Sequence, residues 1–124
     1  MERLECRQAS LLSVDGVLAT TIYDVTDLLK DFLTLPSLIL TAVANAGAAD
    51  LDVTVEVSSD GLTYVEALAF TTIAAGAGDT EALALPFAAR YMQVTVTISA
   101  AGSYDIDIDA YGAKSVRNQL VFVG

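Results

Sequence analysis

The sequence predicts an all-β protein, an antiparallel two-sheet β-sandwich of jelly-roll type. The first indication is residues 51–57, where four apolar residues alternate with three polar ones and a Ser-Ser-Asp-Gly turn follows. Alternation with a period of two places the apolar residues on one face of a strand. The same pattern recurs over residues 92–98 and 104–109. Short turn sequences separate the apolar segments, which is typical of sandwiches; a closed barrel is the alternative.

The predicted strands share a short length, β-branched or alternating apolar residues, and flanking turn residues. They span residues 5–14, 17–23, 37–44, 51–57, 62–70, 81–85, 90–99 and 104–111. The apolar residues 120–123 close the chain, and their pairing is open: they add as a strand to a neighbouring molecule, or they pair with the first strand of their own sandwich.

Turn residues and one helical signal delimit these strands. Asp15-Gly16 predicts a turn between the first two strands, and Asp60-Gly61 predicts a hairpin. Residues 26–33 predict one short helical turn, with acidic residues near its start and Pro36 after it. Residues 71–80 are rich in glycine and alanine and predict an exposed loop. Residues 1–124 are therefore expected to form a single domain.

The composition excludes several classes of protein. A net charge of −10 argues against nucleic-acid binding, which needs clustered Lys and Arg. The charge-free residues 32–49 contain proline, asparagine and glycine and lack an aromatic belt, so we expect no membrane span. The first eight residues do not resemble a secretory signal. The sole cysteine, Cys6, excludes an internal disulfide and is expected to be a small buried residue of the first strand.

Charge and hydropathy together predict association between subunits. Apolar residues make up 54% of the chain, which is more than the core of a small domain needs. Part of the apolar surface is therefore expected to be buried against other molecules. Residues 9–113 hold fourteen acidic residues against Lys30 and Arg90, while the other four basic residues lie near the chain ends. Residues 1–8 and 114–124 are therefore candidate arms that dock on the acidic body of a neighbour. The alternative is a solvated acidic surface that aids solubility.

The sequence offers no catalytic machinery. It has no histidine, no Gly-x-Ser-x-Gly motif and no phosphate-binding loop, so we expect neither an enzyme nor a cofactor. Asp105, Asp107 and Asp109 lie about 6.6–6.8 Å apart along one strand. A calcium ion needs its oxygens at roughly 2.3–2.6 Å, so these carboxylates cannot all reach one ion. No metal site is predicted, and the three carboxylates are interpreted as a charged outer face that prevents edge aggregation.

The tyrosines raise a carbohydrate-binding alternative, because sugars stack on exposed aromatic rings. Tyr104 shares the parity of Ile106 and Ile108 and is expected in the core. Tyr91 and Tyr111 have outward parity and are the candidate contact residues. The sequence contains no tryptophan to extend such a platform.

Two segments carry a resemblance to a known family. Residues 51–61 followed by Leu62-Thr63-Tyr64, and later Ala89-Arg90-Tyr91-Met92-Gln93-Val94, resemble the discoidin-like, galactose-binding-type sandwich. Members commonly show a Val-x-Val-Glu-x-Ser-x-Asp-Gly-x-Thr-Trp strand-turn-strand, with Tyr64 here at the tryptophan position, and an Ala-Arg-Tyr-Val-Arg-Val strand. The resemblance covers residues 38–112 and implies a β-sandwich that binds sugars or surfaces.

Size, acidity and the abundance of alanine and valine also resemble bacteriophage virion proteins, namely capsid decoration (cement) proteins and tail or fibre accessory modules. This resemblance implies a non-enzymatic structural protein of the virion, assembled in the host cytoplasm. The expected partners are further copies of the chain, with a trimer among the candidate forms, and other capsid proteins. A carbohydrate- or surface-binding module that contacts a glycan is the alternative. The candidate interaction residues are Arg3, Arg7, Lys114, Arg117, Leu120, Val121, Phe122, Val123, Tyr91 and Tyr111.

Overall fold

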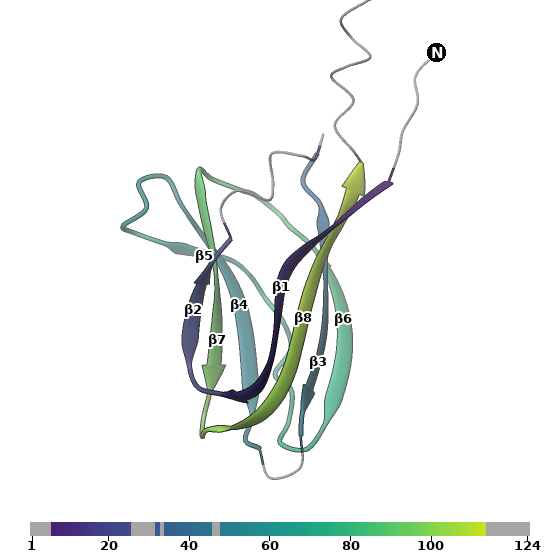
Figure 1. Ribbon diagram of the computed structural model, residues 1–124. Coiled ribbons are helices and arrows are strands. Elements are labelled where there is room, and N and C mark those ends of the chain that lie inside the picture. The colour runs from purple at the N-terminus through teal and green to yellow at the C-terminus, as the bar shows by residue number, and fades with distance from the viewer. Residues whose placement is uncertain (1–5, 26–31, 33, 46–47, 114–124) are drawn as a thin grey trace, which may run out of the picture.

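Two four-stranded antiparallel sheets lie face to face in the computed structural model of the chain (Figure 1). The structure describes residues 6–25, 32, 34–45 and 48–113. The arrangement confirms the predicted antiparallel two-sheet sandwich. The strands are β1 (Cys6–Leu18), β2 (Thr21–Asp24), β3 (Ser37–Ala44), β4 (Leu51–Ser58), β5 (Val65–Ala69), β6 (Gly78–Ala84), β7 (Tyr91–Ile98) and β8 (Gly102–Ala113).

The order of the strands is that of a jelly roll. One sheet has the order β1-β8-β3-β6 and the other β2-β7-β4-β5, so every connection except the β4–β5 hairpin crosses between sheets. The first and last strands, β1 and β8, are paired neighbours. Each sheet keeps two edge strands, so the protein is a sandwich and the closed-barrel alternative does not apply.

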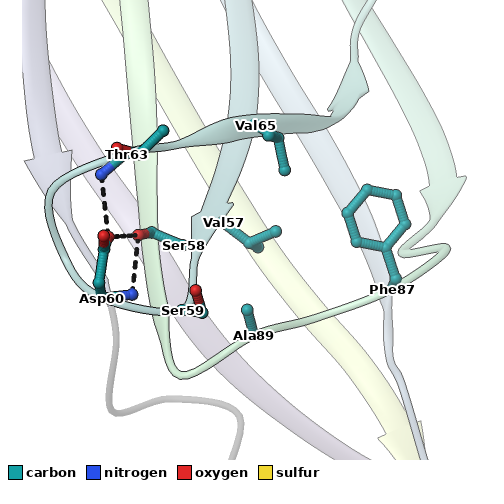
Figure 2. Close-up of a pocket in the computed structure, with 8 residues that line it drawn as sticks. All are labelled: Val57, Ser58, Ser59, Asp60, Thr63, Val65, Phe87 and Ala89. Carbon is teal, nitrogen blue, oxygen red and sulfur yellow. Dashed lines mark hydrogen bonds between the residues drawn. The ribbon is translucent and has the colours of Figure 1, made fainter.

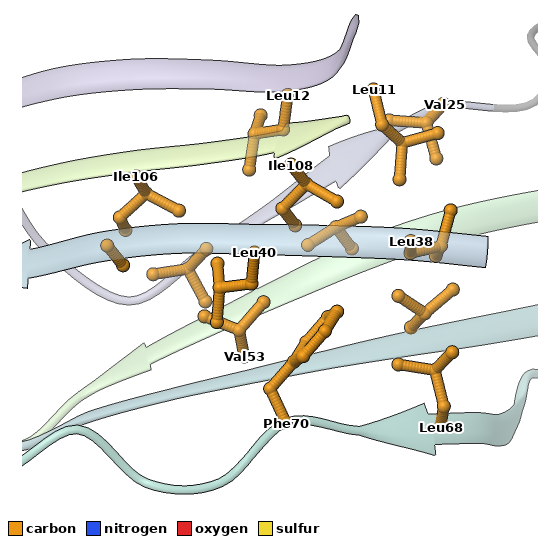
Figure 3. Close-up of a cluster of buried hydrophobic side chains, with 14 of the residues drawn as sticks. Leu11, Leu12, Val25, Leu38, Leu40, Val53, Leu68, Phe70, Ile106 and Ile108 are labelled. Carbon is orange, nitrogen blue, oxygen red and sulfur yellow. The ribbon is translucent and has the colours of Figure 1, made fainter. Parts of the chain in front are cut away.

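The core lies between the sheets and uses alternate residues of the central strands. The inward residues of β4 are Leu51, Val53, Val55 and Val57, all of them buried. The other central strands contribute equivalent rows, and Figure 3 shows side chains from both sheets meeting in the middle. These rows are Met92, Val94, Val96 and Ile98 from β7, Leu38, Leu40, Ala42 and Ala44 from β3, and Tyr104, Ile106, Ile108 and Ala110 from β8.

The turn predicted at Asp15-Gly16 is wrong, because β1 continues through it to Leu18. Asp15 pairs with Asp105 and Gly16 with Tyr104, so the ladder with β8 overrides the turn signal. Gly16 has φ +101°, a conformation that glycine adopts without a steric penalty. The last part of β1 curls toward β2 (Figure 1).

Other predicted boundaries shift in the structure. The strand expected over 62–70 covers only Val65–Ala69, and the one expected over 81–85 begins earlier, at Gly78. The strand expected over 17–23 begins at Thr21, since the preceding residues belong to β1. The helical turn predicted for 26–33 lies outside the described residues except for Phe32 and is not assigned, and the apolar residues 120–123 also lie outside them.

Tyr104 joins two loops at the end of the sandwich away from the chain termini. Its side chain is fully buried, as its parity predicts. The hydroxyl accepts a hydrogen bond from the Ala49 amide at 2.9 Å. It also lies 2.9 Å from the Ala49 carbonyl oxygen and 3.2 Å from that of Ala100, to which it can donate. The phenol therefore fixes the β3–β4 and β7–β8 connections to each other.

Replacing Tyr104 with phenylalanine should lower the free energy of unfolding by about 1 kcal/mol, because only the hydroxyl and its hydrogen bonds are lost. Hydrogen exchange of the Ala49 amide should become faster in this variant. The Leu51 amide, which donates to the Ile73 carbonyl at 2.9 Å, is the internal control and should be unaffected. Unchanged exchange at Ala49 would show that the hydroxyl does not hold the loops.

Candidate functional site

The turn between β4 and β5 is organised by two side chains, Ser58 and Asp60. The buried Ser58 hydroxyl donates to Asp60 Oδ1 at 2.8 Å and accepts from the amides of Asp60 and Gly61 at 3.2 and 2.9 Å. Asp60 Oδ1 also accepts from the amides of Leu62 and Thr63, at 2.8 and 3.0 Å. Gly61 has φ +78°, as the Asp-Gly hairpin signal requires. The predicted hairpin is confirmed.

These hydrogen bonds lower the pKa of Asp60 from its ordinary value of 3.8 to about 2. The backbone amide of Thr63 is the main cause, followed by the amide of Leu62 and the hydroxyl of Ser58. Donors directed at a carboxylate favour its charged form. Asp60 is fully exposed to solvent, so this end of the molecule carries an ionised carboxylate at every pH above about 2.

Beside this turn lies a hollow of about 340 Å³, which we call the hairpin hollow (Figure 2). Val57 and Val65 form one side, Phe87 approaches from the β6–β7 connection, and the Ser58–Asp60 turn forms the polar rim (Figure 2). The hollow is thus apolar inside and acidic at its border. Its lining residues are Val57, Ser58, Ser59, Asp60, Thr63, Val65, Phe87 and Ala89.

Exposed apolar side chains gather at the same end of the sandwich. Leu62 is 86% exposed, Val65 56% and Phe87 44%. Leu35, also exposed, lies at this end because it precedes Ser37, which pairs with Tyr111 near the end of β8. Four of the seven large hydrophobic residues that are exposed in the described part of the chain are therefore found here. This end of the sandwich is therefore a candidate surface for contact with another molecule.

The two candidate tyrosines lie on different sheets. Tyr91 begins β7 and Tyr111 lies near the end of β8, so their outward faces point to opposite sides of the sandwich. The Arg90 guanidinium lies 5.4 Å from the centre of the Tyr91 ring. The same ring lies beside Gly61, where a Cβ would be in ordinary van der Waals contact with it, at 3.5 Å. The structure does not bring Tyr91 and Tyr111 together into one aromatic platform.

The acidic residues of β8 face outward, as their parity predicts. Asp105, Asp107 and Asp109 are joined on this face by Asp15, which pairs with Asp105 from β1. The Ser13 hydroxyl donates to Asp107 Oδ1 at 2.6 Å. In the described segments, no group of three acidic or cysteine residues is arranged to hold a metal ion. None of these segments forms a helix with the length and apolarity needed to cross a membrane.

Glu56, on the outer face of the other sheet, is bonded within the protein. Its Oε1 accepts from the Thr95 hydroxyl at 2.6 Å and from the Gln93 amide at 3.1 Å. The Thr54 hydroxyl donates to the other carboxylate oxygen. Glu56 is thus a cross-strand link between β4 and β7 rather than an isolated acid.

The terminal candidate residues are mostly outside the described part of the chain. Arg3, Lys114, Arg117, Leu120, Val121, Phe122 and Val123 lie in the two terminal ranges 1–5 and 114–124. Arg7 is in β1, where its backbone pairs with Gly112. The described chain therefore enters and leaves the sandwich side by side, at the end that carries the β4–β5 turn (Figure 1).

Sequence reasoning missed the hairpin hollow, although one signal was present. Leu62, Val65 and Phe87 are large apolar residues beside turn residues, outside the clear alternation of the central strands. Apolar residues in connections indicate exposed apolar surface more directly than total composition does.

The chain matches no protein-family model and no curated protein sequence. Among solved structures it resembles a chain of the Bacillus endospore appendages, described as a novel family of disulfide-linked pili, with a TM-score of 0.58 and 15% identity over 92% of this chain and 93% of that one. A chain from infectious bursal disease virus, Gx strain, gives a TM-score of 0.46 and 10% identity over 90% of this chain and 33% of that one. The first likeness concerns the fold alone, and the second is too weak to carry an argument.

Replacing Asp60 with asparagine should lower the thermal stability of the protein at neutral pH, and replacing it with alanine should lower it further. Asparagine keeps an acceptor oxygen for the amides of Leu62 and Thr63, whereas alanine removes it. Thermal unfolding followed by circular dichroism gives the ranking.

The difference in stability between the native protein and the Asp60→Asn variant should depend on pH. Because the folded pKa of Asp60 is lowered, its ionised form stabilises the fold fully above pH 3.8, and this contribution is lost as the pH falls through about 2. The stability difference between the native protein and Asp60→Asn should therefore shrink over that interval. A difference that stays constant down to the lowest pH would contradict this role of the carboxylate.

Proposed function

We propose that this chain is a non-enzymatic structural protein that works as a homo-oligomeric subunit of a virion, specifically a capsid decoration or cement protein of a bacteriophage. The observation that carries the proposal is the apolar surface at the β4–β5 end, where Leu62, Val65 and Phe87 are exposed. A subunit that joins others needs such a surface, and a freely diffusing monomer gains nothing from it. The oligomer is a trimer or another closed form.

The likeness to the Bacillus appendage protein supports the structural part of the proposal. That chain matches nearly end to end, with 93% of its length covered, and it belongs to a protein that forms pili. A single jelly roll of this size is thus sufficient for a subunit of a protein assembly. The common fold leaves the kind of assembly open.

The number of cysteines favours a shell-type subunit over a disulfide-linked fibre. The 124 residues contain one cysteine, Cys6, and one thiol can join only two chains. A continuous disulfide-linked polymer needs at least two linking cysteines in each subunit. Within these 124 residues a disulfide can therefore join at most two chains, and the remaining contacts of the proposed oligomer are non-covalent.

A structural role also agrees with the chemistry of the described surface. Asp60 holds its own turn, Glu56 links two strands, and Asp107 accepts from Ser13. Each of these three carboxylates accepts hydrogen bonds that hold the fold, and none is arranged with a second titratable group as an acid–base pair.

Removing residues 114–124 should abolish assembly without unfolding the sandwich. The eight strands of the described residues lie within 6–113, so the fold should persist while the arm is lost. Native mass spectrometry of the full chain should show a discrete oligomer, and the truncated chain should be monomeric with an unchanged circular dichroism spectrum. Normal assembly of the truncated chain would exclude the arm.

Replacing Cys6 with alanine should leave the oligomer intact, and so should a reducing agent. The reason is that one thiol per chain cannot maintain an assembly of more than two subunits. Native mass spectrometry with and without reductant measures this directly. Conversion of the oligomer to monomers on reduction would contradict the proposal of non-covalent contacts.

A carbohydrate- or surface-binding module, in a phage tail or fibre or in a bacterial protein, is the alternative function. The discoidin-like resemblance supports it, because residues 51–64 form β4 and the turn beside the hairpin hollow. The separation of Tyr91 and Tyr111 on opposite faces weighs against a shared sugar platform. In the same mass measurement, a strict monomer that binds glycans and loses them on Tyr91→Ala would favour this alternative.

A further inference from the structure

We infer that the hairpin hollow is the docking site for the C-terminal segment 114–124 of a second copy of this chain, with the apolar residues 120–123 seated in it. The inference rests on the proposed function, since it identifies the surface that receives the arm. It assigns a role to residues on β4, β5 and the β6–β7 connection that the sequence does not single out.

The chemistry of the hollow fits a short apolar peptide better than a small ligand. Its volume of about 340 Å³ is at the low end for small-molecule pockets, which span roughly 300–1,000 Å³. The walls are the side chains of Val57, Val65, Phe87 and Ala89, and the hollow is open to solvent beside the edge strand β5. Such a site accommodates one or two apolar side chains of a longer chain.

The C-terminal segment has the complementary composition. Residues 120–123 are Leu-Val-Phe-Val, and Lys114 and Arg117 precede them. The border of the hollow carries the ionised carboxylate of Asp60. The apolar half of the segment is complementary to the walls of the hollow, and its basic half is complementary to the acidic border.

The segment also starts in a suitable place and is long enough. The described chain ends at Ala113, at the end of the sandwich that carries the β4–β5 turn (Figure 1). At about 3.3 Å per residue, the seven residues that follow Ala113 can span up to about 23 Å when extended. That reach exceeds the radius of gyration of a domain of this size, which is about 14 Å. The arm can therefore cross to a neighbour placed end to end.

The mode of docking has a consequence for symmetry. Each copy offers one segment and one hollow, so two copies can exchange segments across a two-fold axis, or successive copies can pass the segment head to tail around a closed ring. A cyclic oligomer follows directly from this contact, in keeping with the trimer considered above.

The test uses the full chain with Val65→Lys, which places a charge in the hollow. Ile22→Lys is the matched control, because Ile22 and Val65 lie on the two edge strands of the same sheet and are 60% and 56% exposed. Sedimentation velocity should show that Val65→Lys raises the dissociation constant of the oligomer at least about tenfold, the loss expected for a central apolar anchor. Ile22→Lys should leave it unchanged. If Val65→Lys does not fold, Phe87→Lys replaces it, because Phe87 lies in the β6–β7 connection and not in a strand. Phe87→Lys should weaken the oligomer in the same way.

A mixing experiment identifies the occupant. Val65→Lys blocks the hollow but keeps the segment, and Phe122→Lys blocks the segment but keeps the hollow. Each variant alone should be monomeric, whereas an equimolar mixture should form a heterodimer, because one of the two contacts is restored. Native mass spectrometry distinguishes the two variants by mass.

The outcomes separate the inference from the proposed function. A native chain that stays monomeric overturns both. A native oligomer that Val65→Lys and Phe87→Lys leave intact overturns the inference alone, as does equal weakening by Ile22→Lys. Weakening by Val65→Lys without a heterodimer in the mixture shows that the segment of a second copy is not the occupant, which also overturns the inference.

Discussion

Burial of alternate residues between the two sheets is the constraint on which the rest of this structure depends. The inward rows of β3, β4, β7 and β8 form nearly the whole core. Because side chains alternate strictly along a strand, a shift of one residue in β8 would move Ile106 and Ile108 to solvent and Asp105 and Asp107 into the core. The cost of burying unpaired carboxylates therefore fixes the register of β8 against both of its neighbours.

The same constraint determines the chemistry of the outer faces. Once Ile106 and Ile108 point inward, the aspartates between them must point outward, whatever their function. The pairing of β1 with β8 places Asp15 directly opposite Asp105, and like charges on directly opposite residues repel. Two copies placed with these acidic faces together would repel as well. In the assembly proposed above, contacts between copies would avoid this acidic face and use other surfaces, such as the β4–β5 end where Leu62, Val65 and Phe87 are exposed.

Strands buried by regular alternation could be predicted from the sequence, and irregular ones could not. The predicted strands over residues 37–44, 51–57, 92–98 and 104–109 are all present. They could be predicted because burial of one face leaves alternating or apolar residues in the local sequence. The continuation of β1 through Gly16 depends on its pairing with residues 102–105 of β8, far away in the sequence, and this pairing overrides a local turn signal. The bulge that lets the neighbouring residues Leu11 and Leu12 both be buried depends on the same ladder.

The hairpin hollow was beyond sequence reasoning for a related reason: it joins β4, β5 and the β6–β7 connection, which only the jelly-roll topology brings together. The Asp60 turn explains why it exists as a formed surface. The amides of Leu62 and Thr63 are bonded to Asp60 Oδ1, and the turn is fixed to β4 through the buried Ser58. A rim held in this way loses little conformational freedom when a partner docks, so the exposed apolar side chains beside it can contribute most of their burial to affinity.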